Sequence, residues 1–172
     1  MRNKWFLALS ISLACIFITA CSEESAQTTA IKDVLQAQFS APDLELAEII
    51  SEMKQIDSET HSVQKLDEYN KNVYGNYFVE DAFVSFIGSN GYAYAQTATM
   101  NNHTLNLENV EITQDKDFPE LYNFVADVIV DKDTADEVQT EVEGKVSFSK
   151  KEEDKIEAIK YTNDNGLSEV LR

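Results

Sequence analysis

Histidine side chains are the first candidates for chemistry in this sequence of 172 residues. A pocket enzyme would place a His beside an Asp to abstract a proton. However, His61 falls between two expected helices and His103 falls in the turn-like segment 101–103, so we expect both to be solvated. The sequence also contains no nucleophile elbow, P-loop, dinucleotide-binding fingerprint or HExxH motif. We therefore expect no catalytic residue and interpret the chain as a protein that is not an enzyme.

Acidic side chains crowd two connections and could bind a hard cation through their oxygen atoms. The denser connection contains Asp131, Asp133, Asp136 and Glu137. It does not fit the EF-hand template, which requires Gly at its sixth position and Glu at its twelfth, where this chain has Asp136 and Val142. We expect a solvated acidic turn, with weak Ca²⁺ binding as the alternative, and we predict neither a metal site nor a cofactor. The second acidic connection, residues 115–120, is interpreted in the same way.

The charge balance excludes one class of partner. Asp and Glu total 31 residues against 14 Lys and Arg, which gives a formal net charge of −17. Nucleic-acid affinity depends mainly on cationic contacts with phosphate, so a protein that binds nucleic acid directly is not expected. Hydrophobic residues make up 43% of the chain, which is enough to build a folded core.

The beginning of the chain has the order of a secretory signal peptide. A positive start, residues 1–4, precedes an apolar run, residues 5–18, and small residues then lead to Cys21. A retained transmembrane anchor is the alternative, but the apolar run is shorter than the roughly 20 residues that a spanning helix needs. Cys15 lies within this run, so removal of residues 1–20 would leave a single cysteine and allow no internal disulfide.

Residues 18–21, Ile-Thr-Ala-Cys, resemble the lipobox of bacterial lipoproteins. This resemblance implies cleavage between Ala20 and Cys21 and a diacylglyceryl thioether on the sulfur of Cys21. Because two or more acyl chains hold a protein firmly on a membrane, we expect an extracytoplasmic protein anchored to the membrane through the lipid on Cys21. In a Gram-positive host this would be the outer leaflet of the cytoplasmic membrane. Residues 21–28 lack apolar periodicity after the cysteine and are interpreted as a tether.

Four helical segments are expected in the first half of the body. Apolar residues recur at helical spacing in residues 31–39 and 62–75. Between them, Ser40 is expected to cap a second helix that ends near Met53. Residues 79–87 fit both a helix and a strand, and we prefer a helix because two acidic residues suit its first turn.

Strand-like alternation begins after Gly91, where Tyr92 and Tyr94 alternate with alanines. Further strands are expected at residues 105–113 with a bulge near Glu108, at residues 122–130 in a central position, and at residues 138–149 and 155–162. Helices followed by strands favour the α+β class. We expect N-terminal helices packed on a curved antiparallel sheet of about four to five strands, within one domain that covers residues 29–172.

This order of elements resembles the NTF2-like/cystatin-like superfamily, and in particular small extracytoplasmic lipoproteins of Firmicutes. The resemblance covers residues 29–172 and rests on the helical segments AIKDVLQAQFSA and YGNYFVEDAFVSFIGSNG and on the strand segments LNLENVEIT, LYNFVADVIV, VEGKVSFS and KIEAIKYTNDNGLSEVL. It implies that the sheet and the helices form a cone. Members of this superfamily use the cone as an enzyme pocket, a ligand pocket or a docking surface.

The leading functional prediction is a non-enzymatic module that binds another protein of the cell envelope. A component of the cell wall is the other partner considered, and the prediction rests on the lipobox, the tether, the polar outer face of the strands and the missing catalytic set. The alternative is a lipoprotein that binds a small ligand in a cone whose mouth is lined by Tyr92, Tyr94 and Tyr122. An enzyme with a catalytic pocket is the least favoured interpretation.

Overall fold

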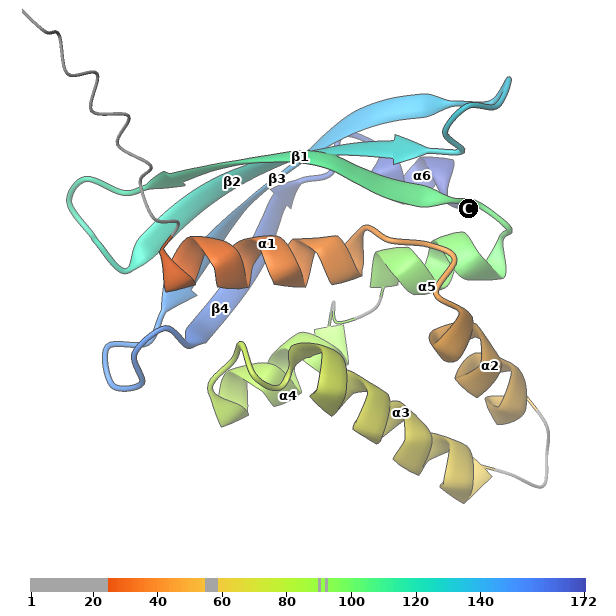
Figure 1. Cartoon of the computed structure of the whole chain (residues 1–172), viewed down its shortest axis with the longest axis horizontal. Coiled ribbons are helices and arrows are strands. Elements are labelled where there is room, and N and C mark those ends of the chain that lie inside the picture. Colours follow the sequence, from red (N-terminus) through yellow and green to blue (C-terminus); the bar gives the residue numbers. More distant parts are fainter. Residues whose placement is uncertain (1–24, 55–58, 90, 92) are drawn as a thin grey trace, which may run out of the picture.

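The computed structural model describes residues 25–54, 59–89, 91 and 93–172. Within these residues the helices precede the sheet, and one short helix follows it (Figure 1). The helices are α1 (Ala26–Gln38), α2 (Leu44–Met53), α3 (Glu59–Tyr74), α4 (Glu80–Ser89), α5 (Ala93–Met100) and α6 (Leu167–Val170). The strands are β1 (Leu105–Gln114), β2 (Leu121–Val130), β3 (Val138–Phe148) and β4 (Ile156–Asn163). The predicted α+β class is confirmed.

The four strands form an open antiparallel sheet in the order β1-β2-β3-β4. The predicted bulge is confirmed, because the pairing of β1 with β2 shifts register between Leu107 and Asn109. Glu108 is the extra residue of this bulge, and it lets Leu107 and Val110 face the same side of the sheet. The central position of β2 is also confirmed, since it pairs with β1 and β3.

The first helix packs along one face of this sheet (Figure 1). The hydroxyl of Ser25 caps α1 by accepting the backbone N–H of Thr28 at 3.2 Å. Ile31, Val34 and Leu35 recur at helical spacing, and each is fully buried. Because α1 begins at Ala26, the last three residues of the segment predicted as a tether are helical.

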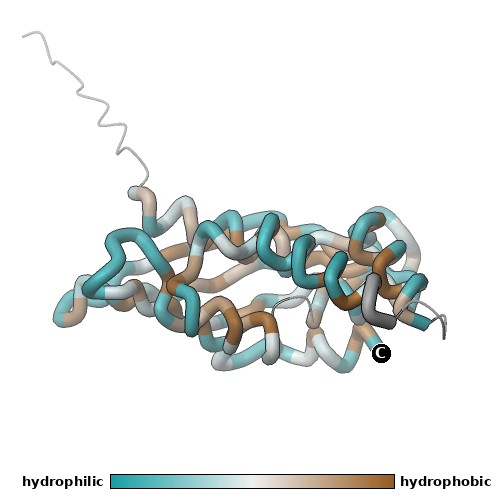
Figure 2. The backbone as a smooth tube through the Cα atoms, turned by 90° about the horizontal axis from the view of Figure 1, so that it is seen from below, coloured by the Kyte–Doolittle hydropathy of each residue, from teal (hydrophilic) through white to brown (hydrophobic). Residues whose placement is uncertain are grey.

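The helices α2 and α3 pack against each other and build a second, smaller hydrophobic cluster. It contains Leu46, Ile49, Ile50 and Tyr69. Seen from the helix side, hydrophilic and hydrophobic stretches alternate along the turns of the helices (Figure 2), as expected when each helix buries one face. In the described part of the chain, the structure contains no helix that is both long enough and apolar enough to cross a membrane.

The prediction that Ser40 caps the second helix is wrong. The N-cap is Asp43, whose Oδ1 accepts the backbone N–H of Leu46 at 2.9 Å. The hydroxyl of Ser40 instead accepts a hydrogen bond from Nε2 of Gln36 at 2.7 Å. Ala41 is drawn toward the sheet by an isolated antiparallel bridge with β1, so the turn that enters α2 is delayed until Asp43.

The strand expected after Gly91 is a helix, α5. The alternation of tyrosine and alanine covers only four residues, which is too short to outweigh the high helix propensity of alanine. Ala95 and Ala98 lie three residues apart on the buried side of α5, which is helical rather than strand-like spacing. The helix preferred over a strand for residues 79–87 is confirmed as α4, which begins one residue later, at Glu80, and extends to Ser89.

Candidate functional site

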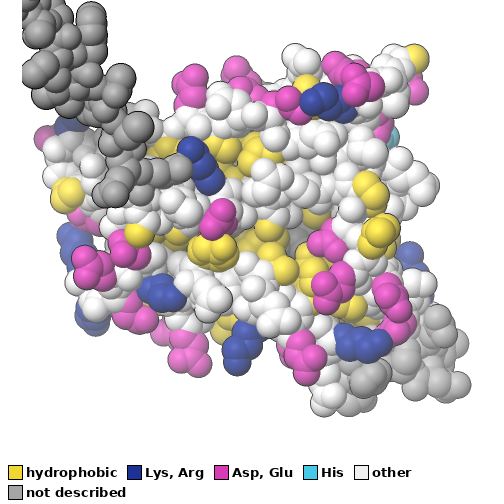
Figure 3. Space-filling view, in the orientation of Figure 1, with side chains coloured by type: hydrophobic (Ala, Val, Ile, Leu, Met, Phe, Trp, Pro, Cys, Tyr) yellow, Lys and Arg dark blue, Asp and Glu magenta, His cyan; other side chains and the backbone are white. Residues whose placement is uncertain are grey.

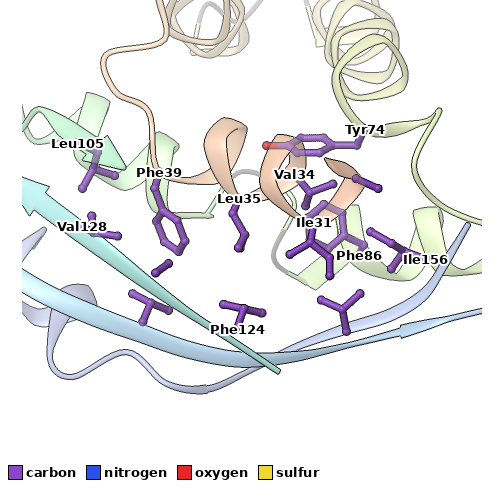
Figure 4. Packing of buried hydrophobic residues seen from close by; sticks show 14 of the residues in the cluster. Ile31, Val34, Leu35, Phe39, Tyr74, Phe86, Leu105, Phe124, Val128 and Ile156 are labelled. Carbon is purple, nitrogen blue, oxygen red and sulfur yellow. The ribbon is translucent and has the colours of Figure 1, made fainter. Parts of the chain in front are cut away.

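The face of the sheet that α1 covers is filled by side chains and belongs to the core (Figure 4). Leu35 and Phe39 reach down from α1 toward the sheet. Phe124 of β2 lies below them and Val128 of β2 lies beside Phe39, and all four are at most 2% exposed. A small ligand at this place would have to displace core side chains.

Tyr94, one of the three tyrosines proposed to line a pocket, lies on α5 and packs into an aromatic group. Its ring centroid is 5.2 Å from that of Phe39 and 5.5 Å from that of Tyr161. It also borders a hollow of about 240 Å³ together with Thr97 and Ser168. Burial is the main cause that raises the pKa of Tyr94, so its phenol stays protonated at neutral pH.

Tyr122 lies at the other end of α1 from Tyr94. It is buried on β2, where its ring packs edge-on against Phe148 with centroids 5.4 Å apart, and its hydroxyl is within reach of Ser25. Ser25 precedes α1, whereas the Phe39 that contacts Tyr94 follows it. The structure therefore does not bring Tyr94 and Tyr122 together, and Tyr92 lies outside the described residues.

A buried glutamine, Gln38, connects α1 with α3, with β4 and with the turn before α5. Nε2 of Gln38 donates to the hydroxyl of Tyr74 at 3.1 Å and to the carbonyl of Gly91 at 2.5 Å. Its Oε1 accepts the hydroxyl of Tyr161 at 3.3 Å. Burial raises the pKa of both phenols. The sequence does contain a signal for the burial of Gln38: it lies seven residues after Ile31, on the same face of α1 as the buried apolar residues.

His103 is not a freely solvated loop residue, contrary to the sequence prediction. Its Nδ1 lies 2.7 Å from Oδ2 of Asp131, and its side chain is 27% exposed. The other carboxylate oxygen of Asp131 accepts the backbone N–H of Thr104 at 2.9 Å. These two contacts lower the pKa of Asp131, and the hydrogen bond from the N–H of Thr104 has the larger effect. They also fasten the loop after β2 to the start of β1. His61 lies within α3 rather than in a connection.

Hydrogen bonds engage two of the carboxylates in the acidic connection after β2. The N–H of Asp133 donates to Oε2 of Glu137 at 2.8 Å, and Asp131 is engaged by His103 and Thr104. Among the residues that the structure describes, no group of three or more His, Cys, Asp or Glu side chains is arranged to hold a metal ion.

An acidic groove of about 780 Å³, which we call the sheet groove, crosses β2 and β3. Asp127 of β2 lies directly opposite Glu141 of β3, and like charges in that position are destabilising. Asn109 donates to Asp127 at 3.2 Å, and Glu108 pairs with Lys132 at 2.6 Å. The residues that line the sheet groove are Glu108, Asp127, Val128, Ile129, Gln139, Thr140, Glu141 and Asn165.

A second groove, which we call the α1–α3 groove, has a volume of about 560 Å³ and lies between these two helices. Figure 3 shows hydrophobic side chains exposed in a band that follows the lower side of α1. The lining residues are Asp33, Gln36, Ala37, Ser40, Pro42, Asp43, Tyr69, Val73 and Tyr77. The sequence analysis did not predict this groove, because it considered only the apolar stripe of residues 31–39, and Asp33 and Gln36 lie outside that stripe.

The residues of the lipobox, including Ala20 and Cys21, lie outside the described residues. No family model, no curated protein and no solved structure matches this chain. The function must therefore be argued from the residues and the surface of the chain itself.

Proposed function

We propose that this chain is a lipoprotein of the bacterial cell envelope whose folded domain binds another envelope protein and catalyses no reaction. We also propose that its α+β fold is of the NTF2-like/cystatin-like type. The order of four helices, a fifth short helix and an antiparallel meander supports the fold proposal, as does the packing of α1 against the inner face of the sheet.

The anchor part of the proposal is supported by the sequence before α1. An apolar run after a positive start ends in Ile-Thr-Ala-Cys, with Cys21 as the acceptor of the lipid. The net charge of −17 would keep the domain away from anionic lipid headgroups, so the lipid rather than the protein surface would make the membrane contact. Labelled palmitate is expected to enter the wild type and to be absent from Cys21→Ala. Equal labelling of both, or no labelling of the wild type, would refute the anchor.

The binding part is carried by one observation: the inner face of the sheet is filled, whereas two acidic grooves remain open at the surface. The described residues that line these grooves include carboxylates but no Lys or Arg. Surface grooves with charge and partly buried apolar walls are suited to protein partners.

The binding test is crosslinking in intact cells that express the full chain. We expect one envelope protein to be crosslinked reproducibly and to recover this chain when it is purified in turn. The Cys21→Ala chain serves as the control, because its release from the membrane should lower the yield of that crosslink. A wild-type chain that yields no reproducible partner would contradict the proposal.

A further inference from the structure

The α1–α3 groove has the dimensions of a helix-docking site. Asp33 and Ala37 lie one turn apart on α1, with Ser40 just beyond its end, and Tyr69 and Val73 lie one turn apart on α3, with Tyr77 just beyond its end. Because each wall spans seven or eight residues of chain that are helical over most of their length, the groove runs for roughly 10 Å, about two helical turns.

Each end of the groove contains a carboxylate that is held by a tyrosine of the opposite wall. The hydroxyl of Tyr77 donates to Oδ2 of Asp33 at 3.0 Å, and the hydroxyl of Tyr69 donates to Oδ2 of Asp43 at 2.6 Å. An ionised carboxylate accepts about four hydrogen bonds, so each of these groups keeps capacity for a cation. Burial is the main cause that raises the pKa of both phenols, so both remain donors.

The middle of the groove is apolar. Ala37 and Val73 are half-buried between the two carboxylates, and Pro42 is exposed beside them. Leu44, which follows Asp43 on the outside of α2, is 77% exposed. The groove thus alternates acid, apolar surface and acid along its length, with aromatic rings at both ends.

We propose that the α1–α3 groove is a docking surface for a basic amphipathic helix of the partner protein. Two cationic side chains of that helix, about two turns apart, meet Asp33 and Asp43, and an apolar side chain between them packs on Ala37 and Val73. This inference rests on the proposed function and specifies the partner that the domain binds.

Charge and backbone geometry favour this occupant over others. A second copy of the chain carries 31 acidic against 14 basic residues and would be repelled, as would an anionic membrane surface. The groove is built by two helices and offers no unpaired strand edge, so addition of an extended strand has no backbone partner there. A helix laid between α1 and α3 places cations on both carboxylates.

The test measures binding of a synthetic peptide to the full chain in neutral detergent. The probe is a labelled peptide of about 16 residues made of Ala, Leu and Lys, with lysines seven positions apart and leucines between them. The matched probe has Glu in place of Lys. Fluorescence anisotropy at about 0.15 M salt is expected to show that the lysine peptide binds and that the glutamate peptide does not.

Two double variants locate the binding surface, and both remove two negative charges. Asp33→Asn with Asp43→Asn changes the α1–α3 groove, and Asn preserves the N-cap of α2. Asp127→Asn with Glu141→Gln changes the sheet groove by the same charge. We expect the first pair to raise the Kd about tenfold and the second to raise it less than about twofold. Gln36→Lys, an exposed change within the α1–α3 groove, is expected to weaken binding as well.

Several outcomes would overturn the proposal. These are equal effects of the two double variants, an effect of the sheet-groove variant alone, and no binding of the lysine peptide to the wild type. A dimer that is lost in the Asp33→Asn, Asp43→Asn variant would show that a second copy occupies the groove. If the crosslinked envelope partner persists in that variant, the domain still binds a protein but not through this groove. If the wild type has no partner, the proposed function itself fails.

Discussion

Gly144, at the centre of β3, offers the sharpest test of how the sheet packs against α1 and its neighbours. A methyl group at this position would lie 2.5 Å from Cε1 of Phe124, closer still to its Cζ, and 2.7 Å from the carbonyl oxygen of Lys160. Phe124 is 2% exposed and the carbonyl belongs to β4, so neither neighbour has free space in which to retreat.

We expect Gly144→Ala to destabilise the fold by about 2–3 kcal/mol, toward the upper end of the range for overpacking in a core. A domain of this size loses roughly 2–4 °C in Tm for each kcal/mol, so the Tm is expected to fall by about 5–10 °C. Because the ring of Phe124 is the main obstacle, Phe124→Leu should cost less in the Gly144→Ala background than in the wild type.

Urea unfolding monitored by circular dichroism provides the measurement, and Gly88→Ala provides the matched control. A methyl group on Gly88 meets nothing within 4 Å, and the residue lies in α4, so this change is expected to be neutral or to stabilise by up to about 1 kcal/mol. A Gly144→Ala protein within about 0.5 kcal/mol of the wild type would refute the packing described for β3.

Three further predictions concern polar contacts. Replacing Gln38 by Leu leaves two buried tyrosine hydroxyls without their amide partner, and it is expected to cost about 2–3 kcal/mol in urea unfolding; a neutral effect would contradict the network. Asp43→Ala removes the acceptor for the N–H of Leu46 and for the buried hydroxyl of Tyr69, and it should cost about 2–3 kcal/mol, whereas Asp43→Asn keeps an acceptor for both and should cost less by the same measurement. The pKa of Asp131 is lowered, chiefly by the N–H of Thr104, so its contribution to stability is complete above an unfolded-state pKa of about 3.9 and is lost as the pH falls through the lower folded-state value. The free energies of unfolding of wild type and Asp131→Asn should therefore differ at about pH 6 and converge below about pH 3, and a constant difference would rule out this linkage.

Long periodic segments were predictable, and short ones were not. The strands expected at residues 122–130 and 138–149 are β2 and β3, in which alternating residues such as Phe124 and Val146 are buried. The change of parity in β1 located its bulge to within one residue. In contrast, the four residues of alternation at 92–95 predicted a strand wrongly where α5 begins, because so short a pattern is outweighed by the helix propensity of alanine and by the packing of Ala95 and Ala98.

Of the candidate site, individual residues were visible in the sequence but their neighbours were not. His103 and Asp131 were both noted as polar loop residues, yet their pairing depends on the loop after β2 returning to the start of β1. The opposition of Asp127 and Glu141 likewise depends on strand register. Tyr94 and Tyr122 were predicted to line one cone mouth, but their separation to opposite ends of α1 follows from the way this helix lies along the sheet.

The sequence by itself determines what is local: a charged start with an apolar run before Cys21, the acidic composition, and the helical or alternating periodicity that makes the chain α+β. Tertiary structure alone decides which distant side chains meet, as when Gln38 joins Tyr161 across 123 residues and when Asp33 and Tyr77 close one end of the α1–α3 groove. The reason is physical. Periodicity is a property of successive residues, whereas a groove or a buried polar network exists only after separate elements have packed at one particular angle and register.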